Sequence, residues 1–244
     1  MSKKELVVLY LKKCFGFLAS VNLVTMLHCA KPEAVQAQAG RDAQLLQLKM
    51  SIPMLDAKIR SSPSADAYFM RGFANYAIGK HEAAEVDFAV AENLKYTAKP
   101  FEFHELRGSN LLVLKKNEEA VAQLGKALEI RPNDTPCLIN RASANFELGQ
   151  YKEALEDAQK ASKLDPKSSA AQQVVGTCYL KTGQLALALQ YLNQAVLNEP
   201  KNFEAFQYRG LTYLKLGKKD LAEKDFAEAE AKGYAPGKSF EEVN

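Results

Sequence analysis

Pairs of alanines recur along this chain at a nearly constant period, which constrains the fold more than any other feature of the sequence. The first members of the pairs are separated by steps of 36, 34, 34 and 34 residues, and the second member always follows seven residues later. The pairs are Ala84/Ala91, Ala120/Ala127, Ala154/Ala161, Ala188/Ala195 and Ala222/Ala229. A repeat of this length predicts stacked supersecondary units rather than one globular core.

Each period is typical of a hairpin of two α-helices. When each unit is numbered from its first residue, position 8 is always small and position 15 is glycine in four units of five. Position 8 is Gly72, Gly108, Ala142, Gly176 and Gly210, and position 15 is Gly79, Lys115, Gly149, Gly183 and Gly217. Glycine suits a helix C-terminus because it adopts left-handed backbone angles without strain. The spacing predicts helix A over positions 1–14 and helix B over positions 18–31, with small side chains where the helices approach.

This pattern resembles the tetratricopeptide repeat family over residues 65–236. The resemblance implies an all-α, right-handed α-solenoid of about five hairpins, because one hairpin cannot bury its own apolar face. The predicted units are 65–98, 101–134, 135–168, 169–202 and 203–236. Residues 40–64 are expected to form an N-terminal capping helix, and residues 237–244 a C-terminal tail. The apolar contacts predicted for the capping helix are Leu45, Leu46, Leu48, Leu55 and Ile59.

Residues 1–39 differ from the rest of the chain in charge. They carry five lysines against two glutamates, whereas the remainder has 27 basic and 27 acidic residues and so lacks the positive surface of a nucleic-acid binder. A basic start, a 14-residue apolar run from Cys14 to Leu27 and a small-x-small sequence ending at Ala39 are typical of a secretory signal peptide. We expect cleavage after Ala39, or alternatively after Ala37, and an exported protein, periplasmic or secreted. An uncleaved membrane anchor, a lipoprotein modified at Cys29 and a cytosolic chain are the other interpretations.

Arginine occupies position 7 in four units, and aspartate follows 16 residues later in three of those four. The co-variation predicts three ion pairs within hairpins, each worth at most about 1 kcal/mol if half exposed. These pairs are Arg71–Asp87, Arg141–Asp157 and Arg209–Asp225. In the second unit Arg107 is expected to face Gln123, and in the fourth Val175 and Tyr191 replace both partners. Binding of an anionic partner by these arginines is the alternative interpretation.

Glutamate occupies positions 21 and 28 in the two outer units. These residues are Glu85, Glu92, Glu223 and Glu230, whereas the middle units have Val121, Leu155, Leu189, Leu128, Ser162 and Val196 there. A solenoid needs polar faces at its ends. The glutamates are therefore predicted to face water, so that the five units form a complete stack.

The sequence pattern does not converge on a catalytic or metal site. His81 begins a sequence that lacks the second histidine of a zinc-protease helix, and it is predicted to form a solvated pair with Glu85. His104, Cys137 and Cys178 are predicted to be packed side chains. No phosphate-binding loop or nucleophile elbow is present. We therefore predict no enzyme activity, no cofactor and no metal.

The resemblance implies that the A helices line a concave surface, which positions 2, 5, 6, 9, 12 and 13 tend to face. The residues predicted to bind a partner there are Phe69, Phe73, Tyr76, Ser109, Leu112, Asn140, Ser143, Phe146, Gln173, Thr177, Gln207 and Leu211. An apolar surface with neutral polar groups suits a peptide or helix with apolar anchors. The alternative is that these residues belong to the core or lie beneath the N-terminal helix.

The resemblance also argues against one binding mode. Co-chaperones of the family hold an acidic chaperone tail with lysine, asparagine and arginine side chains. Of the corresponding residues here, Glu105, Ser109, Asn140, Ala170 and Val174, only Asn140 matches, and Glu105 would repel the tail. The predicted function is a non-catalytic protein–protein interaction scaffold that binds a partner peptide or helix. The alternative is a permanent structural subunit or assembly factor of a cell-envelope complex.

Overall fold

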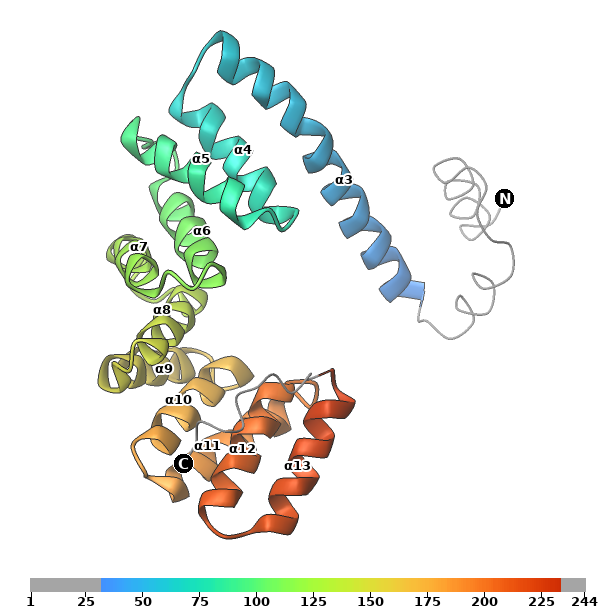
Figure 1. The fold of residues 1–244 in the computed structure, drawn as a ribbon, viewed down its shortest axis with the longest axis vertical. Coiled ribbons are helices and arrows are strands. Elements are labelled where there is room, and N and C mark those ends of the chain that lie inside the picture. Colours follow the sequence, from blue (N-terminus) through green and yellow to red (C-terminus); the bar gives the residue numbers. More distant parts are fainter. Residues whose placement is uncertain (1–31, 234–244) are drawn as a thin grey trace. The chain divides into compact units, whose positions relative to one another are not determined.

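A computed structural model describes residues 32–233, which form helices and connecting turns with no strand among them (Figure 1). The helices are α3 (Pro32–Ser61), α4 (Ala65–Ala77), α5 (His81–Asn93), α6 (Pro100–Val113), α7 (Asn117–Ile130), α8 (Thr135–Glu147), α9 (Tyr151–Leu164), α10 (Ser169–Lys181), α11 (Leu185–Asn198), α12 (Phe203–Lys215) and α13 (Lys219–Ala231). The predicted all-α solenoid of helical hairpins is confirmed. The chain divides into two compact units, Met1–Ser51 and Ile52–Asn244.

The first unit contains the N-terminal part of α3. This helix begins at Pro32, so the predicted cleavage sites after Ala37 and Ala39 lie within it. The leader sequence at residues 1–31, with Cys29, and the tail at residues 237–244 lie outside the described residues. The signal peptide, the lipid site and the tail therefore remain predictions. Within residues 32–233, no helix has both the length and the hydropathy needed to cross a bilayer.

The apolar residues of α3 differ in their exposure. In the first unit, Leu45 and Leu46 are 41% and 58% exposed, and their contacts with the hairpins stay a prediction. In the second unit, Ile59 is buried as predicted. The Asp56 carboxylate on the same segment accepts a hydrogen bond from Arg71 Nη1 on α4 at 2.7 Å. This C-terminal segment of α3 thus belongs with the hairpins.

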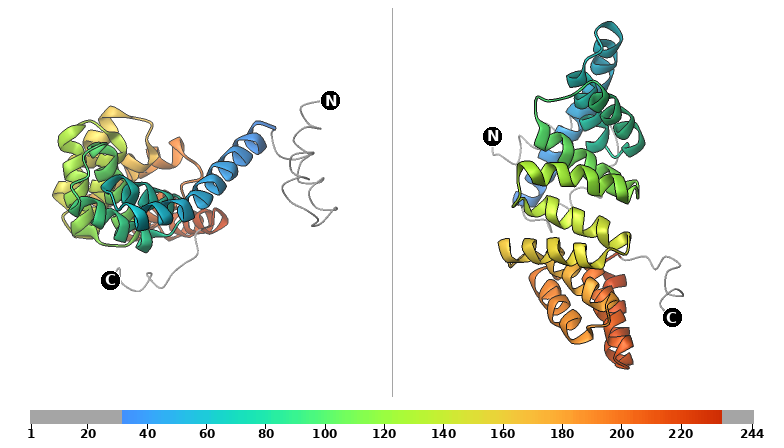
Figure 2. Two further views of the ribbon diagram at one scale, coloured as in Figure 1. Left: turned by 90° about the horizontal axis from the view of Figure 1, so that it is seen from above. Right: turned by 90° about the vertical axis from the view of Figure 1, so that its left-hand side faces the viewer.

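The second unit contains five helical hairpins stacked in chain order (Figure 2). In each, an A helix (α4, α6, α8, α10 or α12) packs against the B helix that follows it. Adjacent A helices also contact one another, whereas adjacent B helices make no comparable contacts in the part of the chain that the structure describes. The A helices therefore lie on the inner side of the stack, where repeat proteins form their concave binding surfaces.

The alanine pairs lie at the helix contacts, and all ten alanines are fully buried. The helices of a hairpin also approach closely at position 8. A Cβ atom added to Gly108 would lie 2.6 Å from Leu124 Cγ, and one added to Gly176 would lie 2.6 Å from Leu192 Cγ. Packing therefore determines these positions, and specificity for a ligand must come from other residues of the A helices.

Each turn between helix A and helix B contains a left-handed residue at position 15. The φ angles are 79° at Gly79, 74° at Gly149, 78° at Gly183 and 73° at Gly217. Lys115 occupies the same position in the second hairpin, with φ of 57°. Its amide donates to the Leu112 carbonyl at 2.9 Å, as the Gly149 amide does to the Phe146 carbonyl at 3.0 Å. The lysine thus makes the same turn, but with a backbone conformation that costs an L-residue about 1–2 kcal/mol.

Replacing Lys115 with glycine is expected to raise the free energy of unfolding by about 0.5–1 kcal/mol. The substitution relieves the left-handed strain, and the greater freedom of glycine in the unfolded chain offsets only part of the gain. Guanidinium unfolding measures the change. Lys116→Gly is the matched control, since Lys116 has φ of −91° and should not gain stability. Equal stabilisation by both substitutions would contradict the explanation.

Candidate functional site

A depression of about 180 Å³ lies on the inner side of the stack, between the A helices α8, α10 and α12. Its lining residues are Ser143, Phe146, Glu147, Gln173, Val174, Thr177, Glu204 and Tyr208. The structure thus brings together four of the predicted groove residues, Ser143, Phe146, Gln173 and Thr177. Sequence reasoning missed the other four, although they occupy positions 2, 6 and 13 of their units. The repeat register could have identified them, because these positions were expected to face the concave surface.

Hydrogen bonds hold the polar side chains of this depression in place. Gln173 Nε2 donates to Glu204 Oε2 at 3.0 Å, and Asn202 Nδ2 donates to Gln173 Oε1 at 2.9 Å, which joins α10 to the start of α12. The hydroxyls of Ser143 and Thr177 donate to carbonyls one turn earlier in their own helices. Thr177 is only 3% exposed. Two lining residues are charged, and both are carboxylates, those of Glu147 and Glu204.

Other predicted groove residues lie on the A helices of the first three hairpins. Phe73, Tyr76, Ser109, Leu112 and Asn140 are all partly buried. Asn140 Nδ2 on α8 donates to Ser109 Oγ on α6 at 3.1 Å. Burial and the negative charge of Glu105 raise the pKa of Tyr76, and a hydrogen bond with Ser109 opposes them. The polar side chains among them, Tyr76, Ser109 and Asn140, form a row across α4, α6 and α8.

Phe69 belongs to the core, so its prediction as a groove residue is wrong. It is 6% exposed, and its ring stacks on Tyr96 with the centroids 4.5 Å apart. The ring of Phe103, on α6 of the second hairpin, has its centroid 6.0 Å from that of Phe69. Tyr96 belongs to the connection after α5, and this connection covers Phe69. Of the two groove residues predicted on α12, Gln207 is partly buried, and Leu211 packs against the apolar cluster of the fourth hairpin.

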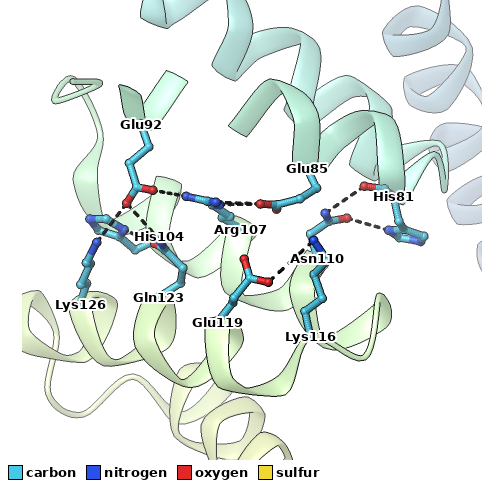
Figure 3. A network of polar contacts seen from close by, with 10 residues as sticks. All are labelled: His81, Glu85, Glu92, His104, Arg107, Asn110, Lys116, Glu119, Gln123 and Lys126. Atoms are coloured by element: carbon cyan, nitrogen blue, oxygen red, sulfur yellow. Dashed lines mark hydrogen bonds and ion pairs between the residues drawn. The ribbon is translucent and has the colours of Figure 1, made fainter. Parts of the chain in front are cut away.

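A second group of titratable side chains lies between the first two hairpins (Figure 3). Arg107 on α6 donates to Glu85 Oε1 through Nε at 3.0 Å and through Nη2 at 2.7 Å, and it pairs with Glu92 through Nη1. Both glutamates lie on α5 of the preceding hairpin, and Arg107 and Glu85 are only 7% and 8% exposed. The prediction that Glu85 faces water is therefore wrong, because position 21 faces the next hairpin. Glu223 and Glu230 on α13 are exposed, as expected for the last described hairpin.

Glu92 and Gln123 extend this network. Glu92 Oε1 accepts from Lys126 Nζ at 3.0 Å and from Gln123 Nε2 at 3.1 Å. Burial opposes ionisation of Glu92, but the hydrogen bonds from Lys126, Gln123 and Arg107 outweigh it and lower its pKa to about 2. The prediction that Gln123 faces Arg107 is wrong. Gln123 Nε2 binds Glu92, and Gln123 Oε1 lies 2.7 Å from Nδ1 of the His104 ring.

His81 does not pair with Glu85, contrary to the prediction. Its Nδ1 lies 2.9 Å from Asn110 Oδ1, and Asn110 Nδ2 donates to the His81 carbonyl at 3.0 Å. Asn110 lies on α6, so this contact also joins the first two hairpins. The side chains of the network bind one another, although Glu85 Oε2 has no hydrogen-bond partner among residues 32–233, and we therefore interpret it as a structural junction.

The three ion pairs predicted within hairpins are confirmed. Each arginine uses Nε and Nη2 to bind both oxygens of its aspartate. The distances are 3.0 and 2.6 Å for Arg71–Asp87, 2.7 and 2.8 Å for Arg141–Asp157, and 2.7 and 2.6 Å for Arg209–Asp225. These arginines are thus held by carboxylates of their own hairpins, which favours the structural interpretation over an anion-binding one.

The two cysteines of the hairpins are buried thiols. Burial raises the pKa of both, that of Cys178 to about 12, so neither is a reactive thiolate at neutral pH. Within residues 32–233, no three His, Cys, Asp or Glu side chains lie together in a group that could hold a metal ion.

The structure defines a class of protein, the α-solenoid of helical hairpins with an inner surface lined by A helices. The tetratricopeptide repeat profile matches residues 145–209, from the end of α8 into α12. Over these residues the chain is similar to the tetratricopeptide repeat family.

Solved structures share the fold at low sequence identity. YrrB, described as a tetratricopeptide repeat protein with an unusual peptide-binding site, is 21% identical, with a TM-score of 0.55 over 73% of this chain and 92% of YrrB. MamA from Desulfovibrio magneticus RS-1 is 20% identical, with a TM-score of 0.59 over 68% of this chain and 93% of that one. The small glutamine-rich tetratricopeptide repeat-containing protein 2 of Mycosarcoma maydis is 34% identical over 93 residues, which are 38% of this chain and 24% of that protein. The chain thus spans about a quarter of that relative's length.

Proposed function

We propose that the chain is a non-catalytic scaffold for protein–protein interaction, whose inner surface binds a peptide or helix of a partner protein. The observation that carries this proposal is the depression between α8, α10 and α12, because three hairpins contribute both apolar and polar side chains to it. Repeat proteins use such concave surfaces to bind extended partners. The peptide-binding site named for YrrB, which shares the fold, supports the same role. The leader sequence supports an exported location for this interaction.

Filling the depression should weaken partner binding. Ser143→Arg places a long side chain among the lining residues, and we expect it to weaken capture of a groove-bound partner by at least about ten-fold, as blocking the centre of an interface does. Full-length protein immobilised on beads would be incubated with extract of its own cells, and bound proteins quantified by mass spectrometry.

Gln194→Arg is the matched control, because Gln194 is exposed on the B helix α11. Circular dichroism would establish that both variants remain folded. Capture of the same proteins in the same amounts by wild type and Ser143→Arg would refute binding in the groove.

The alternative proposal is a permanent subunit or assembly factor of a cell-envelope complex. It draws support from apolar residues exposed on the B helices, such as Val86 at 64%, Ile130 at 47% and Leu197 at 71%. Exposed apolar groups are typical of surfaces that a partner covers. Purification from the native cells distinguishes the two proposals, since a permanent subunit would always co-purify with one partner at a fixed stoichiometry.

A further inference from the structure

The depression between α8, α10 and α12 carries negative charge that no cation of residues 32–233 neutralises. Glu147 lies at the end of α8 and Glu204 at the start of α12, and both are exposed members of the lining. Neither takes part in any of the ion pairs formed within those residues. The arginines at position 7, by contrast, all have carboxylate partners. The two glutamates are therefore available to a cation supplied from outside.

The position of Glu204 is fixed by its neighbours. Gln173 Nε2 donates to Glu204 Oε2, and Asn202 holds the other end of the same amide. An ionised carboxylate accepts several hydrogen bonds at once, so the bond from Gln173 leaves capacity for a further donor. A carboxylate oriented in advance loses less conformational freedom when a ligand binds.

Apart from the two carboxylates and the neutral polar Ser143, Gln173 and Thr177, the lining is apolar or aromatic. Phe146 on α8, Val174 on α10 and Tyr208 on α12 line the depression together with the two carboxylates, which lie on α8 and α12. Lysine and arginine side chains consist of an aliphatic stem and a charged head, and they pack the stem on apolar groups while the head reaches polar ones. Aromatic rings also attract cations to their faces. The apolar and aromatic side chains of the depression, together with its two carboxylates, therefore match a lysine or arginine side chain.

We propose that this depression binds a lysine or arginine side chain of a partner peptide that also presents neighbouring apolar residues. The proposal rests on the proposed function and specifies the chemistry of the partner. The choice of a basic side chain rests on charge complementarity. An acidic peptide is disfavoured because its carboxylates would be repelled by Glu147 and Glu204. Glu105, farther along the inner side on α6, adds negative charge of the same sign. Lys181 at the end of α10 lies outside the lining.

Selection from a phage-displayed library of random peptides of about 12 residues, a length that spans such a groove, tests the proposal on the full-length chain. We expect the enriched peptides to share a lysine or arginine beside apolar residues. By fluorescence anisotropy at low salt, these peptides should bind the double variant Glu147→Gln, Glu204→Gln at least about ten-fold more weakly than wild type. Added salt should weaken binding to wild type because it screens the exposed carboxylates.

The matched control is the double variant Glu129→Gln, Glu153→Gln, which removes the same charge from exposed positions on the B helices α7 and α9. Its affinity should stay within about two-fold of wild type, since distant exposed charges contribute little. Enriched peptides that lack basic residues, or that bind the Glu147, Glu204 variant as tightly as wild type, overturn the proposed cation site. Binding that Ser143→Arg leaves intact, or no enrichment at all, overturns the proposed function instead.

Discussion

Replacing Arg107 with methionine is expected to lower the free energy of unfolding by about 3–5 kcal/mol, the usual cost of removing one partner of a buried ion pair. Arg107 makes two hydrogen bonds to Glu85 Oε1, and Glu85 Oε2 has no hydrogen-bond partner among residues 32–233. The substitution would therefore leave a carboxylate that is 8% exposed with no donor for either oxygen. Guanidinium unfolding of the full-length variant measures the loss.

Two further variants separate this explanation from a general effect of removing arginine. Arg131→Met breaks the pair with Glu102, whose two side chains are 53% and 41% exposed, so its cost should be nearer 1 kcal/mol, about the value for solvated pairs. Adding Glu85→Leu to Arg107→Met removes the unpaired charge and should restore most of the lost stability, because apolar replacements of both partners are often neutral. A loss below about 1 kcal/mol for Arg107→Met alone would contradict the buried-pair explanation.

The destabilisation should also be local. Arg107 and Asn110 on α6 hold Glu85 and His81 on α5, so the variant weakens the junction between the first and second hairpins. In a repeat protein each unit contacts only its neighbours, and a weakened junction lets the terminal unit open separately. Backbone amides of α4 and α5 should therefore exchange hydrogen faster in the variant than those of α10 and α11.

The contacts within hairpins can be predicted from the sequence because they recur at a fixed separation. Arg71–Asp87, Arg141–Asp157 and Arg209–Asp225 all span 16 residues, the distance from position 7 of helix A to position 23 of helix B. The buried alanines follow the same register. Comparing one unit with another inside the chain is therefore enough to find these contacts, without any knowledge of how hairpins stack.

The contacts between hairpins cannot be predicted in the same way. Glu85 and Arg107 are 22 residues apart in different units, and no other unit pairs a position 21 glutamate with an arginine of the next unit, so the chain offers no second copy for comparison. In the sequence, a glutamate at position 21 looks the same whether it faces water at an end of the stack or lies beside an arginine of the next hairpin. Only the stacking direction distinguishes them, and it places position 21 of the first unit against the second hairpin.

The candidate site could be predicted from the sequence only in part. The register assigns the correct helix positions to the inner surface, and it identifies four of the eight residues that line the depression. A preference for apolar and neutral side chains at those positions excludes Glu147 and Glu204, although both face the depression. The register also places Phe69 on the inner surface, whereas the connection containing Tyr96 covers it. The path of a connection depends on tertiary packing and is not encoded in the repeat.

Replacing Leu192 with alanine is expected to lower the free energy of unfolding by about 3 kcal/mol, the typical cost of deleting a fully buried leucine side chain. Leu192 on α11 is 0% exposed and fills the space opposite Gly176 on α10. The variant would leave a cavity between the two helices of the fourth hairpin. Leu197→Ala on the same helix is the control, because Leu197 is 71% exposed and its replacement should change stability by less than about 0.5 kcal/mol. Similar losses for both leucines would show that burial does not determine the effect.

The third hairpin indicates how that cavity can be filled. There the pair equivalent to Gly176 and Leu192 is Ala142 and Ala158, and both alanines are fully buried. Gly176→Ala alone should destabilise, since its Cβ would lie 2.6 Å from Leu192 Cγ, but in the Leu192→Ala background the same methyl group enters vacated space. The double variant should therefore regain about 1 kcal/mol or more of the loss, helped by the better helix propensity of alanine. If the two losses were simply additive, the small residue at position 8 and the large residue facing it would not be energetically coupled.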